Sequence, residues 1–399
     1  NQNSVIMKKI IVLLTFTLSV VSGESQNTSS LITSELELIK QESNLVGFGV
    51  AIVNKDSIIY AKGFGYSNKK LQTPYTTTTV QPIASISKTL LGMALMKAQE
   101  LGLLQLNDAI NTYLPFKIYN PKFKDEHITI RQLANHTSSV LDTDFYNRIY
   151  VFKDKIPNFY KHIPEDIQQN VKEEIHRFNN NKMMFTARFI KNQYSIVGKW
   201  YAPENFSSNL PGTSYKYSNM GANIAAYIIE LVSGDSYTDF LQKHILNPLQ
   251  MDASGWHSKN NPLKNMSTLY WHGYPIPNYE FITYGDGGFM TNIEDFSKFL
   301  STIIKGYNGN QNVIKASSYT KMFEDTSNKH FKKNIFWNID SEKIGHSGND
   351  PGVITHAYFL RKSNHGIIVF ANTSETENDM ESVRDIYRTL LKYSNQLQN

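Results

Sequence analysis

Apolar residues near the two ends of the chain gather in short runs that are typical of strands. Phe48–Val53 and Ser57–Ala61 are separated by three polar residues, which indicates a hairpin, and His356–Leu360 and Gly366–Ala371 form a second pair of strands. Between these pairs, apolar residues recur at helical spacing. The helices that this spacing predicts cover residues 30–42, 85–101, 128–134, 219–232, 237–245, 293–304 and 377–393.

Strands at both ends and helices in the middle predict an α/β chain of the α+β type. One antiparallel sheet would be completed by the two ends of the chain and flanked by helices. Residues 140–205 are aromatic and charged with weaker periodicity, and we interpret them as a mostly helical inserted domain that could cover a site. Residues 24–399 are otherwise predicted to form one domain.

The first residues have the pattern of a targeting segment. Two lysines follow Met7 and precede a short apolar run, residues 10–21, which ends in small residues. We expect residues 1–23 to be a signal peptide, with residues 1–6 upstream of the true start, and the protein to be secreted or periplasmic. The alternative is a retained anchor, so membrane contact is expected only through an uncleaved signal segment.

Composition narrows the function classes. The chain has 399 residues, of which 40% are hydrophobic and 19% charged, as in a globular protein. The formal net charge of +5 is spread without long basic runs, which disfavours nucleic-acid binding. Disulfides and thiolate metal sites are excluded because there is no cysteine. We find no P-loop, dinucleotide fingerprint or zinc-protease motif, so we predict no cofactor and no metal.

The first candidate for chemistry is Ser85 with Lys88. Residues three apart on a helix share a face, so this spacing holds an amine beside a hydroxyl. A neighbouring base that takes the serine proton activates it as a nucleophile. On its own the pair is weak evidence, since a serine and a lysine at this spacing occur by chance in many chains.

A second candidate is Tyr217 with Asn219, between a Pro-Gly turn and the start of a helix. In an extended segment both side chains point the same way. The phenol could relay a proton, and the amide could orient a lysine or bind a substrate amide. The alternative is a surface turn with a helix N-cap at Ser218 or Asn219.

The third candidate is His346 with Gly348, just before a predicted strand near the end of the chain. A glycine on an edge strand lets a substrate approach the backbone closely. The histidine could bind an anionic or carbonyl group of the substrate. The alternative is a structural histidine.

In their order, the three elements resemble the serine β-lactamase and penicillin-binding protein superfamily. The similarity is strongest to the branch with class C β-lactamases, D,D-carboxypeptidases, D-aminopeptidases and secreted esterases, and it covers about residues 30–395. The resemblance implies that Ser85 is the acylated nucleophile and that Lys88 is its base or the electrostatic support of one.

The resemblance also implies roles for the remaining residues. Tyr217 would carry the proton to the leaving group, and Asn219 would hold Lys88 and the substrate. The backbone N–H groups of Ser85 and Asn349 would form an oxyanion hole. Because an amine and a phenol that compete for protons titrate together, neither is assigned as the only base.

Three features depart from the family pattern. His346 stands where relatives usually have lysine, and since an unperturbed histidine is mostly uncharged at neutral pH, its grip on a carboxylate would be weaker. Ser139 stands where relatives usually have glycine. Ser85 and Tyr217 are 132 residues apart, which is unusually far, and the extra length falls in 140–205.

These observations predict a secreted serine hydrolase that acts through an acyl-enzyme on an ester, amide or lactam bond of a small molecule or peptide. The histidine favours an esterase or peptidase with a less anionic substrate. The alternative is a catalytically weak penicillin-binding or sensor protein on the same fold. A metal-dependent hydrolase is disfavoured because the histidines are scattered. The sequence leaves the oligomeric state open.

Overall fold

The computed structural model describes residues 27–157, 165, 167–257, 262–324, 333–374 and 376–397. Its centre is an eight-stranded sheet in which each pair of neighbours is antiparallel. Across the sheet the strands are β10 (Lys333–Asn334), β11 (Trp337–Ile339), β12 (Lys343–Asp350), β13 (Val353–Leu360), β14 (Gly366–Ala371), β1 (Gly47–Val53), β2 (Ile58–Asn68) and β3 (Thr73–Pro74). Because β1 pairs with β14, the predicted closure of one antiparallel sheet by both ends of the chain is confirmed.

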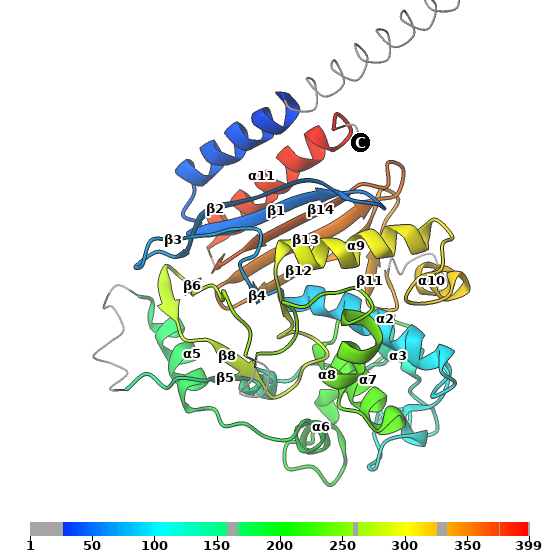
Figure 1. Cartoon of the computed structure of the whole chain (residues 1–399). Helices are drawn as coiled ribbons and strands as arrows, with labels where there is room; N and C mark the ends of the chain where they lie inside the picture. Colours follow the sequence, from blue (N-terminus) through cyan, green and yellow to red (C-terminus); the bar gives the residue numbers. More distant parts are fainter. Residues whose placement is uncertain are drawn as a thin grey trace, which may run out of the picture.

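Helices cover both faces of this sheet (Figure 1). The helix over residues 27–42 and α11 (Glu377–Ser394) lie on one face. The remaining α-helices are α2 (Ser87–Glu100), α3 (Ile130–Ala134), α5 (Gln169–Asn180), α6 (Thr186–Tyr194), α7 (Asn219–Ser233), α8 (Tyr237–Leu241), α9 (Ile293–Tyr307) and α10 (Ala316–Phe323). Shorter helical turns are η1 (Ala84–Ile86), η2 (Ile110–Thr112), η3 (Asp144–Ile149), η4 (Pro203–Asn205) and η5 (Gln242–Leu246).

Strand β14 shows how the two faces are built. Successive side chains of a strand point to opposite faces. Ile367 and Val369 therefore pack with α11 and the helix over 27–42, whereas Ile368 and Phe370 pack in the larger core that contains α2 and α9. Each such fully buried side chain stabilises the fold by about 1.5–3 kcal/mol. Because both faces are buried, the strand is a continuous apolar run and does not alternate with polar residues.

Among the residues that the structure describes, seven short strands lie outside the main sheet. They are β4 (Gln81–Pro82), β5 (Tyr150–Phe152), β6 (Leu269–Trp271), β7 (Tyr274–Ile276), β8 (Tyr279–Phe281), β9 (Met290–Thr291) and β15 (Thr373–Ser374). Within 140–205 the described elements are η3, β5, α5, α6 and η4. Since β5 pairs with β8, this segment is tied to a strand that comes more than a hundred residues later.

Several boundaries differ from the sequence predictions. The first catalytic candidate lies on η1 and not inside the long helix, because α2 begins at Ser87. His346 was expected just before a strand, but it lies within β12. The predicted signal segment, residues 1–23, lies outside the described residues. Among the helices that are described, none has the length and apolar character needed to cross a membrane.

Candidate active site

The site begins at the junction between η1 and α2. Lys88, in the first turn of α2, donates a hydrogen bond from Nζ to Ser85 Oγ at 3.0 Å. Ala84, next to the serine, has φ of +50°, in the left-handed region that a residue with a Cβ rarely adopts. The chain therefore enters this helix through a strained turn that presents the Ser85 hydroxyl beside the amine.

Tyr217 completes the arrangement from a distant part of the sequence. Its hydroxyl donates to Ser85 Oγ at 3.0 Å, although 132 residues separate the two. The Lys88 Nζ also lies 5.1 Å from the centre of the Tyr217 ring. The structure thus brings one serine hydroxyl, one amine and one phenol together, as the sequence pattern predicted.

Lys88 is fully buried, with 0% of its surface exposed. Besides Ser85, its Nζ donates to the backbone oxygen of Asp286 at 2.7 Å. In the part of the chain that the structure describes, no carboxylate lies within ion-pair distance of this amine. Because this buried amine has only neutral acceptors, its charge acts most strongly on the groups that it contacts, which are the serine hydroxyl and the phenol.

The loop that holds Lys88 is itself held by the inserted segment. The carboxylate of Asp286 accepts hydrogen bonds from the Tyr146 hydroxyl on η3 and from Thr283 Oγ1. Burial, followed by the charge of Asp286, raises the pKa of Tyr146 well above its ordinary value, so this phenol stays a donor. Sequence reasoning missed both contacts, because a backbone oxygen leaves no signature and Tyr146 comes from the irregular insertion.

Asn219 has a different hydrogen-bond partner from the Lys88 that the resemblance implies. Its side-chain amide donates to Asp142 at 2.8 Å, and no hydrogen bond joins it to Lys88. Asp142 also accepts from the backbone N–H of Asn219 at 3.1 Å and of Met220 at 2.9 Å, so it binds the positive end of α7. Ser218 is the N-cap of the same helix, as the alternative interpretation held.

The environment of Asp142 is unusual for a carboxylate. Part of the residue stays exposed, but surrounding protein atoms desolvate the carboxylate, and this raises its pKa above the ordinary value. The N–H donors at the start of α7 and the charge of Lys88 act in the opposite direction. Asp142 therefore fixes the helix that follows Tyr217, and the sequence offered no signal for it.

A turn after α3 supports Tyr217. The ring of His136 lies 4.5 Å from the Tyr217 ring, and its Nδ1 accepts from the backbone N–H of Ser218 at 3.2 Å. Ser139, where the resemblance led us to expect a glycine, adopts φ of +67°. The serine thus takes up the backbone conformation that glycine favours, and its Oγ accepts from Asn120.

Strand β12 contributes His346 and Gly348 to the site. His346 is buried, and its ring centre lies 6.3 Å from that of Tyr217. Gly348 is pressed against the turn that carries the serine, since a methyl group there would meet Ile83 O at 2.7 Å and Ala84 Cβ at 2.8 Å. The glycine is therefore required for strand-to-turn packing. The strand is not an edge of the sheet, although β11 pairs only with its first half.

Asn349 follows Gly348 on the same strand. It pairs in register with Ile354 of β13, and its side chain is exposed. The neighbouring register pair is Gly348 with Thr355, whose Oγ1 donates to Ile83 O at 2.9 Å. Asn349 is thus the residue directly after Gly348, which packs β12 against the turn that carries Ser85.

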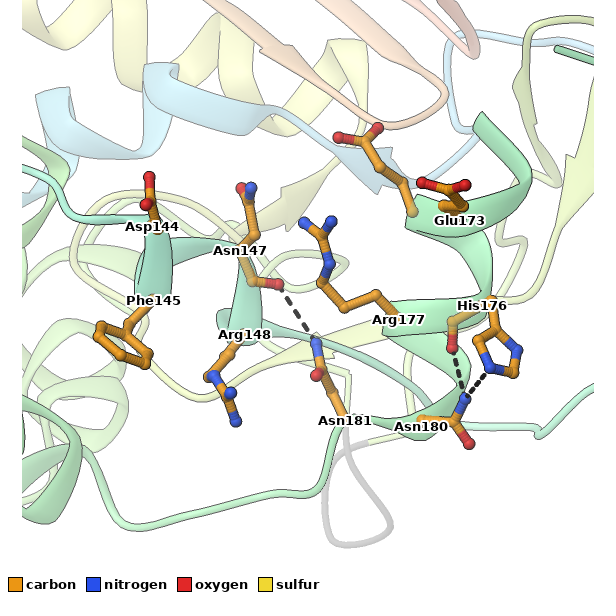
Figure 2. Close-up of a pocket in the computed structure, with 10 residues that line it drawn as sticks. Asp144, Phe145, Asn147, Arg148, Glu173, His176, Arg177, Asn180 and Asn181 are labelled. Atoms are coloured by element: carbon orange, nitrogen blue, oxygen red, sulfur yellow. Dashed lines mark hydrogen bonds between the residues drawn. The ribbon is translucent and has the colours of Figure 1, made fainter. Parts of the chain in front are cut away.

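An open cavity of about 920 Å³ lies between η3 and α5 (Figure 2). All of its lining residues except Phe145 have polar or charged side chains, and they are Asp144, Phe145, Asn147, Arg148, Glu173, Glu174, His176, Arg177, Asn180 and Asn181. Figure 2 shows Asp144, Asn147 and Arg177 pointing toward the same side of the cavity. Ser85, Lys88 and Tyr217 do not line it, but η3 carries both this wall and Tyr146. Among the described residues, no group of three or more acidic or histidine side chains could hold a metal ion.

Comparisons with known proteins agree with this geometry. The profile of the Beta-lactamase family matches residues 35–391. Protein flp of Staphylococcus aureus is 24% identical over 88% of this chain, and the human mitochondrial serine beta-lactamase-like protein LACTB is 24% identical over 70%. The matched regions span 64% and 58% of the lengths of these two relatives.

Two solved structures share the fold. The octameric penicillin-binding protein homologue from Pyrococcus abyssi superimposes with a TM-score of 0.65 at 21% identity, over 92% of this chain and 78% of its own. A class C beta-lactamase gives a TM-score of 0.62 at 18% identity, over 92% and 96% of the two chains. The predicted α+β fold of this superfamily is confirmed.

Proposed function

The chain belongs to the Beta-lactamase family, and on this basis we propose that it is a serine hydrolase that cleaves an ester or amide bond, lactams included, through an acyl-enzyme. One observation carries the proposal. Ser85 Oγ lies 3.0 Å from both Lys88 Nζ and the Tyr217 hydroxyl. These are the distances at which a proton can leave the serine as it attacks.

In the proposed reaction, Ser85 Oγ forms a bond to the carbonyl carbon of the substrate, and its proton passes to the pair of Lys88 and Tyr217. The tetrahedral intermediate then expels the leaving group, which takes that proton. Water attacks the resulting acyl-enzyme, gives a proton to the same pair and releases the acid as Ser85 regains its proton. The pair therefore acts as base and acid in turn.

The charge that develops on the carbonyl oxygen needs donors. We propose the backbone N–H groups of Ser85 and Asn349, because Gly348 packs β12 directly against the serine turn. A donor of this kind typically stabilises the transition state by about 3–4 kcal/mol. We assign Asn219 a positioning role, because its amide binds Asp142 and Asp142 fixes the start of α7.

We propose a small-molecule or peptide substrate that carries little negative charge beside the scissile bond. The support is His346 on β12, because the family resemblance implies a lysine there, and a lysine is ordinarily charged at neutral pH whereas a histidine is mostly uncharged. We further propose secretion or periplasmic export, which rests on the lysines and the apolar run before residue 23.

The test is an activity screen of the purified full chain. Short-chain p-nitrophenyl esters, nitrocefin and D-amino-acid amides are assayed in parallel, with Ser85→Ala as control. We expect turnover of at least one class that is lost in Ser85→Ala. A stable adduct without product release would instead support the sensor alternative, and equal activity of both proteins would remove Ser85 from the reaction.

A further inference from the structure

The inserted segment exposes large apolar side chains around α6. Phe185 is 85% exposed, Ile196 is 78% exposed and Val197 is 73% exposed, and Met183 nearby is 51% exposed. Side chains of this kind normally lie in the core, and several that are exposed in one short stretch of the chain mark an interaction surface. They come from one short stretch of the chain that holds α6 and its two ends.

The local structure keeps these side chains outside. Helix α6 buries Phe189, Ile190 and Tyr194, so its opposite face must point away from the core. After the helix, the Gly198 N–H donates to Ser195 O at 2.7 Å, and this closes a tight turn. Ile196 and Val197 are the two central residues of that turn, so their side chains project into solvent and do not pack on α6.

The same stretch is positively charged. Lys182, Arg188, Lys191 and Lys199 are all exposed. Between Glu174 and Glu204 the chain contains no acidic residue. Phe185 and Arg188 are three residues apart and therefore lie on one face of the chain as it enters α6. Exposed apolar side chains at the two ends of α6 thus flank the exposed cations Arg188 and Lys191 of the helix itself.

We propose that this α6 surface, formed by residues 182–199, docks on an anionic lipid bilayer. Phe185, Ile196 and Val197 would enter the headgroup boundary, and the lysines and arginine would contact lipid phosphates. A second copy of the chain fits less well, since it would bring the same positive charges face to face. Nucleic acid would leave the apolar tips in water.

The proposed lipid contact lies at a different end of the molecule from the first described helix, residues 27–42. Helix α6 lies at the end of the molecule opposite the helix over 27–42 and α11 (Figure 1). The α6 surface therefore defines its own orientation on a bilayer. The proposal does not depend on the chemistry at Ser85.

The test uses the full chain and vesicles of phosphatidylcholine with or without phosphatidylglycerol. We expect co-sedimentation with the anionic vesicles only, weakened at least tenfold by Phe185→Ser with Ile196→Ser, and reduced by Lys191→Glu. The matched control is Leu71→Ser, since Leu71 is 72% exposed in the turn between β2 and β3. Hydrolysis of a short ester and the melting temperature show that each variant is folded.

A second readout reports insertion at the proposed place. The fluorescence of Phe185→Trp should shift to shorter wavelength with anionic vesicles, whereas that of Leu71→Trp should not. Equal sedimentation of the double variant and the Leu71→Ser control, or no shift for Phe185→Trp, would overturn the proposal. If the wild-type protein formed a dimer in solution and the same double variant were monomeric, the occupant of the surface would be a second copy. That result would contradict lipid docking.

Discussion

Replacing Tyr217 by phenylalanine separates the chemistry of the site from its packing. The substitution removes one oxygen and with it the 3.0 Å hydrogen bond to Ser85 Oγ. The ring keeps its neighbours, since the His136 ring lies 4.5 Å away and Lys88 Nζ lies 5.1 Å from the ring centre. A hydrogen bond of this type contributes about 0.5–1.5 kcal/mol to stability, so the variant should fold.

The catalytic loss should be much larger. A positioned group that transfers a proton typically contributes about 10²–10⁴-fold to the rate, which corresponds to roughly 3–5 kcal/mol in the activation free energy. We expect kcat/KM of Tyr217→Phe to fall by this factor on the best substrate of the screen, while the urea unfolding free energy changes by about 1 kcal/mol.

The control is Tyr215→Phe, which removes a phenol oxygen two residues away, and its kcat/KM should stay near that of the wild-type protein. If folded Tyr217→Phe kept kcat/KM within about threefold of wild type, the tyrosine would have no part in proton transfer.

Three further predictions concern the walls of the site and the sheet. Gly348→Ala should lower the unfolding free energy by about 1–3 kcal/mol in urea and reduce kcat, because its methyl meets the serine turn; unchanged values would contradict that packing. Tyr146→Phe should lower kcat about tenfold by loosening the Asp286 loop, and an unchanged kcat would show that the loop holds Lys88 without this phenol. Burial, then Lys343 and Arg384, lower the pKa of His356 to about 4. The unfolded chain binds this proton first, so stability should fall as pH drops from 6.5 to 4, by at most roughly 3 kcal/mol, and His356→Gln should flatten the profile.

The parts of the site that could be predicted are those set by local spacing. Ser85 and Lys88 lie one helical turn apart, so their contact follows from helix geometry wherever the helix begins within a few residues. The paired strands at the two ends could also be predicted, because their apolar runs are short and rich in β-branched or aromatic residues. Tyr217 could be placed in the site only through the resemblance to a family.

The parts that could not be predicted depend on long-range contacts. Asn219 was expected to hold Lys88, but its amide donates to Asp142 from another loop, which fixes the start of α7. The oxygen that holds Lys88 belongs to the backbone of Asp286, and any residue could supply it. The exposure of Phe185 also depends on which face of α6 finds a partner.

The proposed reaction requires that one hydroxyl, that of Ser85, becomes acylated. The most direct measurement is mass spectrometry of peptides from the protein after reaction with a fluorophosphonate probe. We predict one adduct, on the peptide that contains Ser85, with labelling lost in Ser85→Ala and strongly slowed in Lys88→Ala. An adduct on a different residue, or an unmodified Ser85 in a preparation that hydrolyses substrate, would contradict the account.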